Sequence, residues 1–212
     1  MKKIYFVRHG ESEGNLLKVH QSPQTPLTEI RLSQAKIVAL RFSKIQASLI
    51  IASPCLRAQQ TAQAIADKNN LQIITNDLFT EKRGPSELVG LSQNSQQSKT
   101  IRNEIAQHFL DQEGQWQHSD EETATGFANR AKQALKFLSQ RPEESLIVVC
   151  HSLVLHMIFA TVLSQGQNLS LKDLYGIYEN FRINNTSISV AVYDEENRKW
   201  SVDCLNDYSH LG

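Results

Sequence analysis

Short apolar runs alternate with amphipathic helical patterns along this chain, and this alternation limits the fold more strongly than any other feature. Strand-like runs occupy residues 3–7, 49–52, 71–75 and 146–150. Between them, apolar residues recur three or four positions apart, which is the spacing of one helix face. Strands that alternate with helices favour a parallel sheet covered on both faces. The pattern therefore predicts an α/β fold, a three-layer α/β/α sandwich with a mostly parallel central sheet.

The helices expected between these strands have recognisable starting points. Thr28 is a candidate cap for a helix that continues to about residue 42. Ser53 and Pro54 provide a cap and a first-turn proline for a helix that continues to about Lys68. Two further helices are expected, one from Glu121 onward and one over residues 153–163.

The end of the chain has a different period. Apolar and polar residues alternate over 188–192 and 200–204, separated by the turn sequence "DEEN", which predicts an antiparallel hairpin at a sheet edge. Residues 84–120 are less regular and include the polar stretch "SQNSQQS", so we expect a loop-and-helix insertion that forms a lid. No repeat or linker divides the chain, and we expect one domain over residues 1–212.

The charge balance argues against a polyanionic or membrane partner. Lysine plus arginine number 22 and aspartate plus glutamate also number 22, so no general attraction for nucleic acid or anionic lipid is expected. The longest apolar stretch, residues 153–163, is interrupted by His156 and is shorter than the roughly 20 residues of a bilayer span. Three widely separated cysteines favour a reducing compartment. We expect a cytoplasmic protein, monomeric or homodimeric.

Polar side chains follow three of the predicted strands. Arg8 and His9 follow the first, Arg57 lies near the start of the helix after the second, and His151 follows the run that ends at residue 150. Ligands of open α/β sheets bind beyond the carboxyl ends of the strands. We therefore expect two arginines and two histidines at one rim.

Arg57 is informative because of its place on the helix. A cation near a helix amino terminus is disfavoured by the dipole, by a few tenths to about 1 kcal/mol, unless an anion binds there. The planar guanidinium matches a phosphate group well. A surface salt bridge is the ordinary alternative for Arg57 alone. Beside the other strand-end residues, a phosphate site is the better interpretation, whereas a metal site on the two histidines lacks an accompanying acidic cluster.

Four motifs in this order resemble the histidine phosphatase superfamily, also called the phosphoglycerate mutase-like family. They are "VRHGES" at 7–12, "SPCLRAQQTA" at 53–62, Glu81 and "VVCHS" at 148–152, and the resemblance extends from residue 4 to about 190. It implies that His9 attacks phosphorus and becomes phosphohistidine, which requires a neutral imidazole. It also implies that the arginines and His151 stabilise the phosphoryl oxygens.

The resemblance assigns roles to further residues. Glu81 would donate a proton to the leaving alcohol, with Glu87 as the rival acid. Asn15 matches an asparagine that contacts phosphate, and Ser12 lies near it; either could instead cap a helix. The remaining candidates near the phosphate are Gly10, which lets the backbone approach, Ser152 as an extra hydroxyl donor and, more weakly, Thr186. The other five histidines are expected to be structural: His20, His108, His118, His156 and His210.

The chain also departs from the family pattern. Gln24 and Arg31 stand where an acid and a glycine are usual, and Ser152 replaces a glycine. The tryptophan and the Glu-Arg-x-Tyr-Gly sequence of the glycolytic mutases are missing, which favours hydrolysis over intramolecular phosphate transfer. We therefore expect a metal-independent phosphatase that acts on a small phosphomonoester and uses no cofactor. A cofactor-dependent phosphoglycerate mutase and a non-catalytic module that binds a phosphorylated ligand are the alternatives. Three cations suggest a second acidic group on the substrate: Lys82, Arg83 and Arg102.

Overall fold

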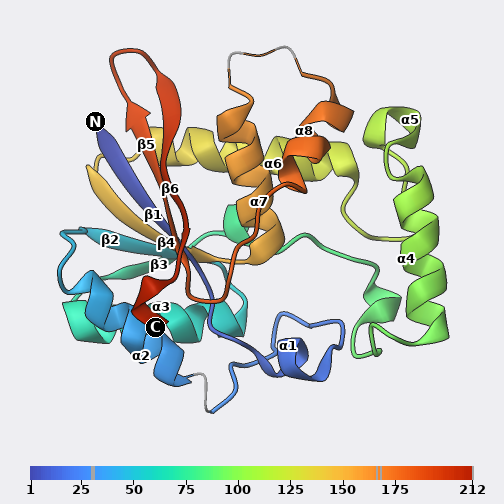
Figure 1. Ribbon diagram of the computed structural model, residues 1–212, viewed down its shortest axis with the longest axis horizontal. Helices are drawn as coiled ribbons and strands as arrows, with labels where there is room; N and C mark the ends of the chain where they lie inside the picture. The colour runs from blue at the N-terminus through green and yellow to red at the C-terminus, as the bar shows by residue number, and fades with distance from the viewer. Residues whose placement is uncertain (30–31, 166, 168, 212) are drawn as a thin grey trace.

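A six-stranded mixed sheet forms the centre of the protein (Figure 1). The computed structural model describes residues 1–29, 32–165, 167 and 169–211. The strand order is β3-β2-β4-β1-β5-β6. The first four strands are parallel to one another, and β5 runs antiparallel to both of its neighbours, β1 and β6. This confirms the mostly parallel sheet with an antiparallel edge. The strands are β1 (Lys2–Arg8), β2 (Leu49–Ala52), β3 (Ile73–Thr75), β4 (Ser145–Cys150), β5 (Ile188–Asp194) and β6 (Lys199–Asp207).

Helices cover both faces of the sheet, because side chains of the central strand β4 alternate between two cores. Leu146 and Val148 belong to the core formed with α6 and α7, whereas Ile147 and Val149 belong to the core formed with α2 and α3. The alternation is the two-residue period of a strand buried on both faces. The predicted three-layer sandwich is therefore correct (Figure 1). These helices are α2 (Leu32–Phe42), α3 (Leu56–Asn69), α6 (Ala124–Ser139) and α7 (Ser152–Leu163).

The starting points of two helices differ from the sequence prediction. The cap of α3 is Cys55, not Ser53, because the Ser53 N–H still bonds to the Val149 carbonyl in the sheet, at 3.0 Å. Helix α6 begins at Ala124 rather than at Glu121, capped by the hydroxyl of Thr123. Arg31, at which the family pattern has glycine, lies outside the described residues.

Helix α8 (Leu171–Tyr178) was not expected, and it begins with a capping box between Ser170 and Asp173. Short 3₁₀ turns lie at η1 (Asp77–Phe79) and η3 (Ser209–Leu211). Within the described part of the chain, no helix combines the length and hydrophobicity needed to cross a bilayer.

The segment 84–120 contains η2 (Ser86–Leu88), α4 (Gln96–His108) and α5 (Asp111–Gly114), and α4 stands well away from the sheet (Figure 1). Residues 90–93, before α4, pair with the segment after α1 (Glu13–Leu17). Gly90 N–H bonds to the His20 carbonyl at 2.9 Å, and Gln93 N–H bonds to the Lys18 carbonyl at 2.8 Å. A lid function for this insertion stays a prediction.

His118 joins two parts of the insertion. Its Nε2 lies 3.2 Å from Glu87 Oε1 on η2, and its Nδ1 lies 3.1 Å from Glu104 Oε2 on α4. Its backbone N–H also bonds to Glu121 Oε1 at 2.6 Å. Burial opposes the charged imidazole, but the hydrogen bonds to Glu104 and Glu87 outweigh burial and raise the pKa of His118. We refer to these contacts as the His118 clasp, and the raised pKa favours its protonated form.

Candidate active site

The two predicted histidines meet because their strands are in register. Arg8 at the end of β1 pairs with Cys150 at the end of β4, so the next residues, His9 and His151, leave the sheet side by side. The His9 N–H bonds to the Cys150 carbonyl at 3.0 Å. The two imidazole rings lie 5.0 Å apart between centroids, inclined by 62°.

Hydrogen bonds assign the tautomer of His9. Its Nδ1 lies 2.6 Å from the Gly10 carbonyl oxygen, which can only accept, so Nδ1 carries the proton. Nε2 therefore carries no proton, and its lone pair accepts a hydrogen bond from Arg57 Nε at 3.2 Å. The residue is 3% exposed. Burial first, and then the charges of Arg57 and Arg8, lower the pKa of His9 well below its ordinary value. His9 is thus a neutral imidazole with a fixed orientation.

Thr61 holds the His9–Gly10 peptide, which adjoins the carbonyl that fixes this tautomer. Its hydroxyl accepts a hydrogen bond from Gly10 N–H at 3.1 Å and donates to the Arg57 carbonyl at 2.8 Å. Asn185 also contributes, since its Nδ2 donates to the His9 carbonyl at 2.9 Å. Neither residue was identified from the sequence. A threonine four residues after Arg57 on a buried helix face was the available signal.

Both arginines turn inward. Arg57 is 4% exposed and its Nη1 donates to the Ser22 carbonyl at 3.0 Å, so a surface salt bridge does not describe it. Arg8 Nη1 donates to the Ile183 carbonyl at 2.6 Å. Among the described residues, Arg8 Nε is buried and has no hydrogen-bond partner. This N–H can donate to a ligand.

His151 is fully buried between the cations and Ser53. Its Nε2 lies 2.7 Å from the Ser53 hydroxyl, and its Nδ1 has no partner in the described part of the chain. Burial first, and then His9, Arg57 and Arg8, lower the pKa of His151 well below its ordinary value. Ser53, expected to cap α3, instead orients this ring.

Glu81 lies at the amino end of α7, immediately after His151. Its Oε2 accepts from Leu153 N–H at 3.1 Å, and its Oε1 accepts from Val154 N–H at 3.1 Å and from Lys82 N–H at 2.9 Å. The rival acid, Glu87, contacts His118 within the insertion. Of the two glutamates, Glu81 is the one beside the histidines.

Ser12 and Asn15 form a capping box at the start of α1. Ser12 N–H bonds to Asn15 Oδ1 at 3.2 Å, and Asn15 N–H bonds to the Ser12 hydroxyl at 3.3 Å. The Ser12 hydroxyl also donates to Gln21 Oε1 at 2.7 Å. Of the two roles considered for this pair, helix capping is the one present here, and contact with phosphate stays a prediction.

Ser152 and Thr186 have structural contacts. Ser152 Oγ lies 3.5 Å from Nδ1 of His156, whose Nε2 bonds to the Phe181 carbonyl at 2.8 Å. Thr186 is buried with φ of 57°, a left-handed conformation rarely adopted by a β-branched residue. Its N–H bonds to the Arg8 carbonyl at 2.9 Å. Thr186 therefore supports the backbone behind Arg8.

The three cations considered for a second acidic group differ in their surroundings. Burial lowers the pKa of Lys82, opposed by nearby glutamates including Glu81. Arg83 Nε donates to the Asp120 carbonyl at 3.1 Å. Arg102 lies on α4, and its charge, after burial, lowers the pKa of His20.

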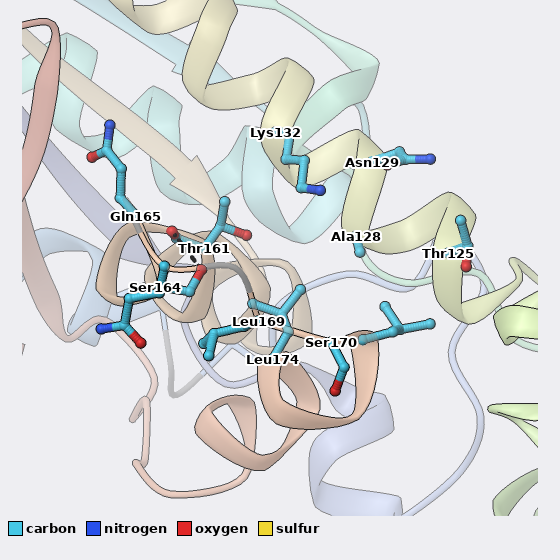
Figure 2. A pocket seen from close by; sticks show the side chains of 12 residues that line it. Thr125, Ala128, Asn129, Lys132, Thr161, Ser164, Gln165, Leu169, Ser170 and Leu174 are labelled. Atoms are coloured by element: carbon cyan, nitrogen blue, oxygen red, sulfur yellow. Dashed lines mark hydrogen bonds between the residues drawn. The ribbon is translucent and has the colours of Figure 1, made fainter.

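A separate pocket of about 390 Å³ lies among α6, α7 and α8 (Figure 2). Lys132 and Asn129 of α6 and Thr161 of α7 lie along its wall, and none of the predicted site residues lines it. Among residues 1–29, 32–165, 167 and 169–211, no group of three or more His, Cys, Asp or Glu side chains is arranged to hold a metal ion.

Comparison with known proteins gives consistent results. The family model described as "Histidine phosphatase superfamily (branch 1)" matches residues 4–208. The probable phosphoglycerate mutase GpmB of Proteus mirabilis is 28% identical over 217 residues, which cover 100% of this chain and 95% of that protein. Bacillus stearothermophilus YhfR superposes with a TM-score of 0.82 at 20% identity and covers 100% of both chains.

A putative alpha-ribazole-5'-P phosphatase from Escherichia coli superposes with a TM-score of 0.79 at 18% identity, covering 97% of this chain and 96% of that one. At such identities the two superpositions establish a shared fold.

Proposed function

The chain belongs to the histidine phosphatase superfamily, and on that premise we propose that it hydrolyses a small phosphomonoester through a phosphohistidine intermediate on His9. The observation that carries the proposal is the state of His9: its Nδ1 proton is held by the Gly10 carbonyl, and its Nε2 lone pair is free of a proton. Such an imidazole can attack phosphorus directly.

In the first step, Nε2 of His9 forms a bond to phosphorus while the bond from phosphorus to the alcohol oxygen breaks. Arg57 Nε, now 3.2 Å from Nε2, must turn from the lone pair to a phosphoryl oxygen as the new bond forms. Arg8, Arg57 and His151 then stabilise the charge on the three equatorial oxygens. The Arg8 Nε and His151 Nδ1 atoms, which have no other partner among the described residues, suit this role.

Glu81 serves as the acid in this scheme. It gives a proton to the leaving alcohol oxygen and takes one from the water that later attacks phosphohistidine, so inorganic phosphate leaves and the starting state returns. Its carboxyl group lies on the Leu153 and Val154 amides, two and three residues after His151. Gly10, Ser12, Asn15 and Ser152 remain proposed phosphate contacts.

A screen of phosphorylated metabolites tests the proposal. Wild type should release inorganic phosphate in EDTA without added metal, and His9→Ala should release none. Brief incubation with a phosphoryl-labelled substrate should leave an acid-labile label on wild type only. Phosphate release that persists undiminished in His9→Ala would overturn the assignment of the nucleophile.

A phosphoglycerate mutase is the second candidate, favoured by the name of the Proteus mirabilis relative. It shares the first step but returns the phosphoryl group to a substrate hydroxyl instead of to water. Phosphorus NMR of 3-phosphoglycerate incubated with the protein and a bisphosphoglycerate distinguishes the two: the appearance of 2-phosphoglycerate supports the mutase, and release of inorganic phosphate without 2-phosphoglycerate supports the hydrolase. Phosphate binding without either reaction would indicate a binding module.

A further inference from the structure

The segment that carries Glu81 has no regular secondary structure of its own. Residues 80–85 follow η1 without helix or strand, yet the proposed acid requires a fixed position relative to His151. Arg130 on α6 supplies the attachment. Its Nη1 donates to the carbonyls of Leu78 at 3.0 Å and Thr80 at 2.6 Å, and its Nη2 donates to the Glu81 carbonyl at 3.4 Å.

Glu122 orients that guanidinium. Arg130 Nε and Nη2 donate to Glu122 Oε1 and Oε2, both at 2.7 Å. All five N–H groups of Arg130 therefore have an acceptor, which is the full capacity of a guanidinium. Phe127 packs against the guanidinium, with its ring centroid 5.1 Å away, and the two charged side chains are only 17% and 15% exposed. Arg130 is fixed on its face and along its edges.

The contacts form a continuous path to the proposed reaction. Arg130 holds the Glu81 backbone from α6, while the Glu81 carboxyl group bonds to the Leu153 and Val154 amides of α7. Because Glu122 balances the guanidinium charge, the pair adds no net charge beside the acid. We propose that Arg130, oriented by Glu122, is the positioning residue that sets Glu81 for proton transfer; the inference rests on the proposed function.

Arg130→Lys tests this role while keeping the charge. The lysine ammonium has three donors on one atom and cannot serve three carbonyls and both carboxylate oxygens. Its effect should depend on the leaving group, because p-nitrophenolate leaves without a proton whereas an alkoxide needs one. We expect kcat/KM, which reports the steps up to release of the alcohol and not the later attack of water, to fall roughly 10²-fold for an alkyl phosphate such as glycerol phosphate, and kcat/KM for p-nitrophenyl phosphate to change little. Glu81→Gln should show the same selectivity.

Arg141→Lys is the matched control. Arg141 also forms a bidentate pair, with Glu143 at 3.0 and 2.5 Å, and also lies over a phenylalanine, Phe137, at 5.9 Å. Loss of this pair should leave the ratio of kcat/KM for the two esters as in wild type. A change in that ratio equal to that of Arg130→Lys would overturn the proposal, because any lost arginine pair would then produce it.

Amide hydrogen exchange gives a readout that needs no turnover. Freed from Arg130, the Glu81 segment should release the Leu153 and Val154 amides, whose exchange should accelerate about five- to tenfold, as expected for one weakened hydrogen bond. Unchanged exchange in Arg130→Lys would overturn the proposal even in a protein that hydrolyses neither ester.

The outcomes separate the two levels of inference. If Glu81→Gln discriminates between the esters and Arg130→Lys does not, the positioning role fails and the proposed function stands. If Glu81→Gln does not discriminate, the acid role falls, and the positioning role falls with it. Equal losses on both esters in Arg130→Lys would indicate a general structural role and overturn the positioning role alone.

Discussion

Lowering the pH should unfold this protein through its buried neutral imidazoles, and His151 allows the effect to be isolated. Burial first, and then the neighbouring His9 and the arginines, lower the pKa of His151 in the folded protein, whereas the unfolded chain titrates near pH 6.5. Below that pH the unfolded state binds a proton that the folded state excludes, so stability falls as pH falls. For an imidazole that stays neutral when folded, the loss from pH 6.5 to pH 5.0 integrates to about 1.6 kcal/mol.

The measurement is urea unfolding of wild type and His151→Gln at both pH values, in a phosphate-free buffer. The glutamine amide can reach the Ser53 hydroxyl, to which Nε2 of His151 lies 2.7 Å, but it does not titrate. Wild type should therefore lose about 1.6 kcal/mol more than the variant, with all other titrating groups cancelling in the difference.

Ser53→Ala provides the control for this comparison. It removes the hydroxyl partner and leaves the imidazole, so it should lower stability at both pH values without changing the loss between them. Equal pH dependence in wild type and His151→Gln would refute the claim that this ring stays neutral.

Three further perturbations test other parts of the site. Arg57→Lys should lower kcat/KM roughly 10²- to 10³-fold in steady-state assays, because one ammonium cannot replace the fork of donors; a change under about tenfold would contradict its role. Thr61→Val should cost about 1–3 kcal/mol in urea unfolding by leaving the Gly10 N–H buried and unpaired, whereas Thr61→Ser should cost much less. The raised pKa of His118 means that its clasp is complete below about pH 6.5 and is lost as pH rises through the raised value. Exchange of the α4 amides, corrected for intrinsic rates, should accelerate over that rise in wild type and not in His118→Gln.

The strands and the rim of the site could be predicted because both depend on local pattern. A buried strand is a run of apolar residues, and its carboxyl end is the next polar residue, so Arg8 and His151 were located without knowledge of the sheet order. Parallel strands then place such ends at the same edge of the sheet, and the adjacency of β1 and β4 brings His9 and His151 together there. The hairpin at 188–204 was equally readable from its period.

The supporting residues could not be predicted because their partners are backbone carbonyls and amides, which every residue carries. Arg130 lies on α6, eight residues after Glu122, and nothing in that spacing indicates a contact with the segment before it; only the tertiary fold brings the carbonyls of Leu78, Thr80 and Glu81 to Arg130. Ser53 fits a helix cap by local rules. In the structure its N–H continues the hydrogen bonding of the sheet one residue beyond β2, and its hydroxyl contacts His151 instead of capping α3. Local rules failed where a residue's partner is distant in sequence.

In the proposed reaction, charge balance explains why the two histidines must be neutral. A phosphomonoester dianion carries two negative charges, and Arg8 with Arg57 supplies two positive ones; protonated imidazoles would exceed the balance and remove the nucleophile. Burial first, and then the charges of Arg57 and Arg8, lower the pKa of His9. In the proposed complex, a bound phosphomonoester neutralises the two arginine charges, and the His9 lone pair faces phosphorus. In this proposed scheme the arginines have two roles: together with burial they keep the nucleophile free of a proton, and they then hold the phosphoryl group that it attacks.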